Sequence, residues 1–226
     1  DERHYWSPTP MPAGGDGPYT VRHGFGYSVF EHSSSRLDQT LTMYAAPGVP
    51  VKVCLMTLKN ISGKTRNLTI MYYARPVLGV DESLTSPYIV TWMENGILYA
   101  ENKYSGEFAG RIAFMCTSAK TGSATGDRVS FFGLDGDPAR PLSVFDAKLS
   151  GVTGAGLDPC MAVAGKVSLM PGEEAKVVFL LGSAENTHKA AEYAKRLLNP
   201  DAAEKELEYV KLYWSRNLEV IQVRTP

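Results

Sequence analysis

Hydrophobic and polar residues alternate along the chain from residue 19 onward. Within Tyr19–Phe30, one face of an extended strand carries every second residue, namely Tyr19, Val21, His23, Phe25, Tyr27 and Val29. This period of two is typical of a half-buried strand, so the segment predicts the first strand of a large antiparallel sheet. Gly24 and Gly26 share the other face and leave a shallow trough, which accepts either a ring of a ligand or partner, or a closely packed crossing loop.

A proline-rich arm, Trp6–Pro12, leads into this strand. Its three prolines, at positions 8, 10 and 12, fix φ and remove backbone donors. We therefore expect the arm to lie extended against other parts of the surface instead of pairing in a sheet.

Strand-like segments then follow one another at short spacing as far as residue 181. We predict a hairpin that joins Val49–Leu58 to Arg66–Ala74 across the turn-forming residues 60–64. Asn95-Gly96, a strong hairpin signal, joins Pro87–Met93 to Ile97–Ala100. We predict further strands at Leu41–Tyr44, Arg111–Cys116, Val129–Phe132, Val163–Leu169 and Ala175–Leu181. The last two form a hairpin across residues 170–173. Residues 133–157 are rich in Gly, Asp and Pro and predict long ordered loops.

About ten strands without intervening helices predict an all-β fold, a sandwich of two antiparallel sheets. The period then changes to that of a helix. Thr187–Leu198 predicts one helix, and Asn199-Pro200 supplies the N-cap and first position of a second, whose apolar stripe includes Trp214 and Leu218. This stripe needs a partner surface. We therefore expect a β domain over residues 1–184 and a helical segment over residues 185–226.

Composition and charge exclude several classes of partner. The 226 residues include 23 basic and 24 acidic side chains, a net charge of -1, which does not favour nucleic acid or an anionic membrane. No apolar run approaches the ~20 residues that span a bilayer, and no charged-then-apolar leader opens the chain, so we expect a soluble domain. Cys54, Cys116 and Cys160 lack zinc-site spacing and predict buried thiols in a reducing cytoplasm. The lack of an initial Met suggests a piece of a longer protein.

Aromatic and charged side chains are the candidates for a binding site, because sugars offer apolar C–H faces to rings and hydroxyls to charged groups. The candidate platforms are Trp6, Tyr27, Trp92 and Tyr104, and the candidate hydrogen-bonding partners are Arg22, Asp127, Arg128 and Asp158. Each also has a structural interpretation: large aromatics are ordinary core residues of a sandwich, and Asp158 suits the cap of a turn.

General acid and base catalysis needs a titratable pair, and the residue types are supplied by His23, His32, Glu31 and Glu94. Nothing in their spacing brings one His and one Glu together. His23 alternates with aromatic residues and is typical of a hydrogen-bonded strand histidine, while His32 is expected to be solvated at a strand end. The sequence therefore predicts no catalytic residue and no metal site.

Several stretches, taken together, resemble the N-terminal region of glycoside hydrolase family 94, formerly glycosyltransferase family 36. They cover nearly the whole chain in order: Trp6–Pro12 with Pro18–His32, Leu58–Asn60 with Tyr72–Gly79, Thr125–Arg128, and Leu149–Cys160. Within the family they are similar to 1,2-β-oligoglucan phosphorylases and to the C-terminal region of cyclic β-1,2-glucan synthases. Phe132–Gly136 departs from the arginine-containing stretch that the family pattern has there, so contacts from that loop are not carried over.

The resemblance implies a β-supersandwich, a fold shared with galactose mutarotase-like domains. It implies that linker helices lead on to an (α/α)6 barrel, with Ile221–Pro226 as the start of the junction. In the family, both the acid and the inorganic phosphate of an inverting phosphorolysis belong to that barrel. The present segment is therefore expected to be noncatalytic and to bind no cofactor.

The resemblance also implies partners. These are a β-glucan or glucooligosaccharide, the chain's own catalytic barrel, and a second copy in a homodimer, with Asp127-Arg128 and the loop Gly154–Pro159 as contact regions. The expected location is the cytoplasm, or the cytoplasmic part of a larger membrane-bound synthase. Two alternatives stay open, a stand-alone carbohydrate-binding module and a mutarotase-like sugar epimerase.

Overall fold

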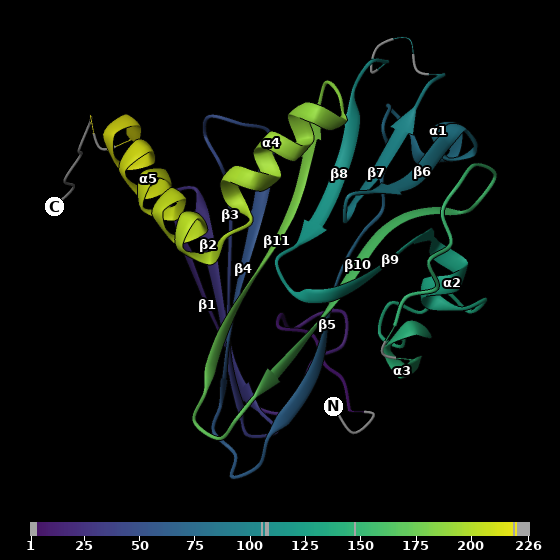
Figure 1. The fold of residues 1–226 in the computed structure, drawn as a ribbon. Helices are drawn as coiled ribbons and strands as arrows, with labels where there is room; N and C mark the ends of the chain where they lie inside the picture. The colour runs from purple at the N-terminus through teal and green to yellow at the C-terminus, as the bar shows by residue number, and fades with distance from the viewer. Residues whose placement is uncertain (1–3, 105, 107–108, 147, 219, 221–226) are drawn as a thin grey trace, which may run out of the picture.

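The structure is a computed structural model that describes residues 4–104, 106, 109–146, 148–218 and 220 (Figure 1). Within those residues, eleven strands form two antiparallel sheets. The larger sheet has the order β1 (Tyr19–Gly24), β2 (Tyr27–Ser34), β3 (Leu37–Ala45), β4 (Val51–Asn60), β11 (Glu174–Ala184), β8 (Ile112–Thr117), β7 (Ile97–Asn102) and β6 (Ile89–Glu94). The smaller sheet has the order β5 (Arg66–Ala74), β10 (Pro159–Leu169) and β9 (Lys120–Asp127). The predicted all-β fold of two antiparallel sheets is therefore confirmed.

The central strands of the larger sheet are buried on both faces because a different layer packs on each. On one face, the smaller sheet closes a hydrophobic core. On the other face, α4 (Thr187–Leu197) and α5 (Pro200–Leu218) cover a second core (Figure 1). Consecutive β4 residues, which point to opposite faces, are consequently all apolar and buried: Val53, Cys54, Leu55 and Met56.

The two predicted C-terminal helices are confirmed. Oδ1 of Asn186 accepts from the Lys189 N–H at 2.9 Å, and Oδ1 of Asn199 accepts from the Asp201 N–H at 2.9 Å, so each helix has its N-cap. The Tyr44 hydroxyl of β3 donates to the backbone carbonyl of Ala203 at 2.5 Å and ties α5 to the larger sheet.

The sheet is thus the partner surface for the stripe of α5, although Leu218 at its end is exposed. The predicted junction at 221–226 lies outside the described residues. Across the described ranges, no helix combines the length and apolar character needed to cross a bilayer.

The predicted first strand is two strands, β1 and β2, joined by a turn at Phe25-Gly26. Gly26 has a φ of +80°, which favours glycine, and the chain reverses there. The trough predicted at the two glycines is filled from within the chain. A Cβ on Gly26 would lie 2.1 Å from Cδ1 of Trp214, and a Cβ on Gly24 would lie 2.2 Å from the ring of Tyr27. An indole ring of α5 therefore docks directly against a glycine of the β1–β2 turn.

Two predicted hairpins are wrong because their strands lie in different sheets. β4 pairs with β3 and β11, whereas β5 pairs with β10, and β10 and β11 are divided between the sheets in the same way. The turn residues 60–64 and 170–173 do reverse the chain, but they carry it from one sheet to the other. Buried Asn60 holds the two crossings together, since its Nδ2 donates to the carbonyls of Lys64 at 2.8 Å and Leu169 at 3.0 Å. The Asn95-Gly96 hairpin of β6 and β7 is confirmed.

The predicted strand at Val129–Phe132 is instead a short helix, α2 (Arg128–Phe132). It is preceded by β9, a polar segment to which alternation assigns no strand. Asp127 caps α2, because its Oδ2 accepts from the Ser130 N–H at 3.0 Å. Consecutive Phe131 and Phe132 are both buried in a third apolar cluster with residues of β10. An apolar run this short does not reveal its period, so it fits a helix as well as a strand. Those of residues 133–157 that the structure describes are mainly loops, as predicted, apart from α3 (Ser143–Asp146).

Candidate functional site

Three of the predicted site residues meet at one end of the smaller sheet, where its strands begin or end. Oδ1 of Asp158 accepts from Nη2 of Arg75 at 3.1 Å, and its Oδ2 accepts from Nη1 of Arg128 at 3.1 Å. The Arg128 N–H also donates to the Asp158 carbonyl at 2.8 Å, next to the cap formed by Asp127. Arg75 makes a second ion pair, at 2.7 Å, with Glu82. We name Arg75, Glu82, Arg128 and Asp158 the Asp158 cluster.

The register of the smaller sheet brings this cluster together. β10 pairs with β5 so that Met161 faces Ala74, and it pairs with β9 so that Pro159 faces Asp127. The end of β5, the start of β10 and the end of β9 therefore lie at the same end of the sheet. Arg75, Asp158 and Arg128 are the residues directly beyond those strand ends, on loops and a helix start held by the rigid sheet.

Paired charges on an apolar base make up the cluster. The side chains of Arg75, Arg128 and Asp158 are 30%, 27% and 32% exposed, so both guanidinium groups are partly accessible. Tyr73 packs against Phe131 with ring centroids 4.8 Å apart, and burial raises the pKa of Tyr73 to about 12. The arrangement offers fixed guanidinium donors to ligand oxygens, while both of its carboxylates are already paired with arginine.

A stacked pair of exposed tyrosines lies on segments that adjoin the cluster in the chain. Tyr88 ends η1 (Ser86–Tyr88), which follows α1 (Glu82–Thr85), and its ring stacks on Tyr104 with centroids 4.5 Å apart and planes 18° apart. The residues are 46% and 75% exposed. Asn102 fixes the neighbouring backbone, because its Nδ2 donates to the Leu78 carbonyl at 3.1 Å and its Oδ1 accepts from the Tyr104 N–H at 3.0 Å. Of the predicted platforms, Tyr104 has the ring face most open to a sugar.

The other predicted platforms pack within the chain. The indole N–H of Trp6 donates to Oε1 of Gln39 at 3.0 Å, and Trp92 stacks on Tyr99 with centroids 5.3 Å apart. Tyr27 packs at Gly24 in the β1–β2 hairpin and has the Lys211 ammonium 5.4 Å above its ring. The structure does not bring these three aromatics into the Asp158 cluster.

The candidate charged and titratable residues of β1 and β2 also lie apart from the cluster. Exposed Arg22 pairs with Glu31 at 2.5 Å across the hairpin. His23 Nδ1 lies 2.8 Å from Oγ of Ser28, as expected of a hydrogen-bonded strand histidine. The expectation for His32 is wrong: it is buried, stacked on the Tyr19 ring and hydrogen-bonded to the Pro18 carbonyl, because residues 15–19 cover this end of β2.

The three cysteines are buried thiols, as predicted. Burial raises the pKa of Cys116 and of Cys160 to about 12, and it also raises the pKa of Cys54. These thiols therefore stay protonated and unreactive at neutral pH. Within the residues that the structure describes, no group of three or more His, Cys, Asp or Glu side chains is placed to hold a metal ion.

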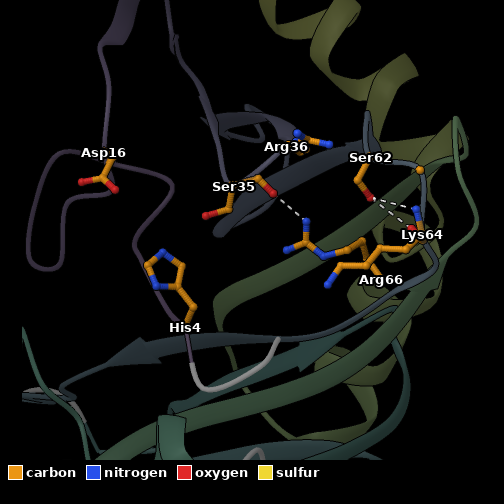
Figure 2. A pocket seen from close by; sticks show the side chains of 8 residues that line it. His4, Asp16, Ser35, Arg36, Ser62, Lys64 and Arg66 are labelled. Carbon is orange, nitrogen blue, oxygen red and sulfur yellow. Dashed lines mark hydrogen bonds between the residues drawn. The ribbon is translucent and has the colours of Figure 1, made fainter.

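A basic pocket of about 550 Å³ opens where the chain crosses from β4 to β5 (Figure 2). It is lined by His4, Asp16, Ser35, Arg36, Ser62, Gly63, Lys64 and Arg66. Nη1 of Arg66 donates to the Ser35 carbonyl at 2.6 Å, and Figure 2 shows Lys64 and Arg66 extending toward Ser35 and His4. Its polar groups suit an anion, but the Arg66 guanidinium is partly occupied by the chain's own backbone. None of the predicted site residues lies in it.

Sequence reasoning missed Arg75, Glu82 and Tyr88. Arg75 stands inside the stretch Tyr72–Gly79 that carries the family resemblance, which was the signal available for it. Glu82 and Tyr88 had none, because their positions follow from α1 and η1, two short turns that a periodicity analysis does not resolve.

Comparison with known proteins places the chain among carbohydrate-active proteins. The sequence model of the family described as "Glycosyl hydrolase 94, supersandwich domain" matches residues 1–200. Cyclic beta-(1,2)-glucan synthase NdvB of Rhizobium meliloti (strain 1021) is 32% identical over 211 residues, which are 92% of this chain and 7% of that protein. N,N'-diacetylchitobiose phosphorylase of Vibrio proteolyticus is 23% identical over 237 residues, 100% of this chain and 29% of that protein.

A solved structure, heparan sulfate lyase HepC from Pedobacter heparinus, aligns with a TM-score of 0.38 and 9% identity over 74% of this chain and 21% of that chain. The chain thus spans less than a third of the length of each of these three proteins.

Proposed function

This chain belongs to the glycosyl hydrolase 94 supersandwich domain family, and from that premise we propose that it is the noncatalytic, carbohydrate-associated domain of a larger enzyme acting on β-linked glucans. The observation that carries the proposal is the family match over residues 1–200. A relative named as a cyclic β-1,2-glucan synthase, 32% identical over almost the whole chain, supports a β-glucan as the saccharide.

A noncatalytic role is supported by the state of the titratable groups. In the Asp158 cluster, Asp158 and Glu82 are both paired with arginine, and the raised pKa of Tyr73 keeps its hydroxyl protonated. His32 is buried beneath residues 15–19, away from solvent. A general acid or base must reach the proton that it transfers, and neither arrangement favours that.

The Asp158 cluster and the Tyr88–Tyr104 pair, which α1 and η1 join along the chain, are our candidates for contact with a saccharide. A stacked, half-exposed pair of rings offers an apolar face to sugar C–H groups, and the accessible guanidinium groups of Arg75 and Arg128 offer donors to hydroxyl oxygens. In the longer protein, we further propose that the domain supports an (α/α)6 catalytic barrel and a homodimer, with residues 185–226 leading toward the barrel.

The test is calorimetric titration of this chain with β-1,2-glucooligosaccharides, with cellobiose as the comparison. We expect saturable binding of the β-1,2-linked sugar that weakens about tenfold in Tyr104→Ala, because stacking on a ring contributes ~1 kcal/mol or more. Tyr209→Ala is the matched control, since Tyr209 is 50% exposed on α5 and belongs neither to the Asp158 cluster nor to the Tyr88–Tyr104 pair.

If the two variants weakened oligosaccharide binding equally, the assignment of saccharide contact to Tyr104 would be contradicted. Absence of saturable heat with either sugar would leave the domain a scaffold, and accelerated mutarotation of glucose would favour the epimerase alternative instead.

A further inference from the structure

The basic pocket at the crossing from β4 to β5 is a separate candidate site, because β5 holds it apart from the Asp158 cluster. Arg66, which lines the pocket, is the first residue of β5, whereas Arg75 of the cluster follows the last. The strand has nine residues. Since each residue of a strand advances ~3.3 Å, the two sites lie about 30 Å apart along β5.

Positive charge dominates the lining of this pocket. Arg36, Lys64 and Arg66 are cationic at neutral pH, whereas Asp16 is the one carboxylate among the described residues that line it. Figure 2 shows Asp16 across the pocket from Lys64 and Arg66. Arg66 is 6% exposed, so water and salt screen its charge less than that of a surface arginine. The potential in the pocket is therefore positive and attracts anions.

One wall of the pocket is a tight turn that places an arginine where glycine is usual. Ser35 and Arg36 connect β2 to β3 and have φ values of +50° and +57°, which Asn and Gly usually supply in a two-residue hairpin turn. This conformation costs an L residue ~1 kcal/mol, and such strain is concentrated at functional sites. The Arg36 carbonyl accepts from the Ile61 N–H at 3.2 Å, so the turn is tied to the crossing.

The crossing itself forms the opposite wall, and Asn60 makes it rigid. Oδ1 of Asn60 accepts from the Ser62 N–H at 2.9 Å and from the Ser62 hydroxyl at 2.6 Å, while its Nδ2 holds the Lys64 carbonyl. Gly63 lies between them with nothing within 4 Å of an added Cβ, so this side of the backbone faces open space. Groups that are already fixed bind a ligand without the cost of ordering them first.

We propose that the basic pocket binds the phosphoryl group of a phosphate monoester. This group carries nearly two negative charges at neutral pH and three acceptor oxygens in different directions, which suits cations that come from both the turn and the crossing. A carboxylate carries one charge and accepts in one plane, so it engages fewer of them. The volume of about 550 Å³ leaves room for the rest of the ester, since small-molecule sites have ~300–1,000 Å³.

The test is a titration of this chain, labelled with 15N-glycine, at pH 7.5. We expect glucose 6-phosphate to shift the amide resonance of Gly63 saturably and to leave that of Gly96, in the β6–β7 turn, unchanged. Inorganic phosphate is expected to shift Gly63 with about threefold weaker binding, because it lacks the contacts of the esterified group. Acetate is expected to bind at least tenfold more weakly than the ester, and glucose to cause no shift.

Three variants locate the site. Arg36→Gln keeps a long side chain without the charge and is expected to weaken binding of glucose 6-phosphate about tenfold, as loss of one charge-assisted hydrogen bond does. Asp16→Asn removes a negative charge from the lining and is expected to tighten binding about threefold, a gain that a damaged fold would not produce. Arg22→Gln is the matched control with no expected effect, because this exposed arginine of β1 lies outside the pocket.

Several results would overturn the proposal. They are a Gly63 amide that does not respond to glucose 6-phosphate, equal effects of Arg36→Gln and Arg22→Gln, and acetate binding as tight as that of the ester. Inorganic phosphate binding as tightly as the ester would assign the pocket to the free ion and overturn the ester. Because glucan binding is measured with neutral oligosaccharides, either proposal can fail without the other.

Discussion

Docking of α5 on the larger sheet depends on one glycine, and this gives a sharp prediction. Ala in place of Gly26 would put a Cβ 2.1 Å from Cδ1 and 2.3 Å from Nε1 of Trp214, far inside van der Waals contact. The indole ring would have to leave its place. The backbone would in addition carry an L residue at a φ of +80°.

The magnitude follows from these two effects. A left-handed φ costs an Ala residue ~1 kcal/mol. Loss of the packing of Trp214, which is partly buried, costs about 2 kcal/mol, below the range of 3–5 for a fully buried tryptophan. We therefore expect Gly26→Ala to lower the free energy of unfolding by about 3 kcal/mol and Trp214→Ala by about 2. In the double variant the collision is absent, so the expected loss is about 3 kcal/mol instead of the additive value of about 5.

Urea unfolding followed by circular dichroism measures all three values. Gly96→Ala is the matched control, because Gly96 also lies in a hairpin turn at a φ of +78° but has nothing within 4 Å of an added Cβ. It is expected to cost only the backbone strain of ~1 kcal/mol. Additive losses in the double variant would refute the docking of Trp214 on Gly26, and so would a Gly96→Ala loss as large as that of Gly26→Ala.

Three further predictions concern paired charges, the cap of α2 and buried thiols. Asp158→Ala leaves partly buried Arg128 without its carboxylate and Arg75 with Glu82 alone, and it is expected to lower the free energy of unfolding by about 1–2 kcal/mol. Arg22→Ala, at an exposed pair, is expected to change it by at most about 0.5 kcal/mol in urea melts, and equal effects would contradict the structure. Asp127→Ala removes the N-cap of α2 and is expected to cost about 1 kcal/mol in the same assay, with no loss arguing against the helix. For Cys116 and Cys160, burial raises the pKa in the folded state from 9.0 to about 12, so the unfolded state loses these protons first as the pH rises. The free energy of unfolding is therefore expected to be retained below pH 9 and to fall between pH 9 and 12. A flat profile over that window would contradict the burial of these thiols.

Local signals in the sequence predicted most individual elements. The Asn95-Gly96 turn, the Asn186 and Asn199 caps and the alternation from Tyr19 onward each depend on neighbours within a few residues, and the structure has an element at each. The errors arose where a local signal has two outcomes. Residues 60–64 reverse the chain whether they close a hairpin or cross to another sheet, and the short apolar run at Val129–Phe132 fits either period.

The candidate site was predictable only in part, for a related reason. Asp127, Arg128 and Asp158 were identified as residue types suited to a saccharide, but their meeting with Arg75 depends on β5 and β9 both pairing with β10. That pairing joins residues more than 80 positions apart, as the Arg75–Asp158 bond shows.

By itself, then, the sequence determined the all-β class, the two C-terminal helices and the family, because alternation, capping and motif order are properties of short segments. Only the tertiary structure decided which strands share a sheet, that Trp214 docks on Gly26, and that Arg75 and Arg128 both meet Asp158. These depend on contacts between distant segments, whose free energy is gained only when the two sheets and the helices pack together.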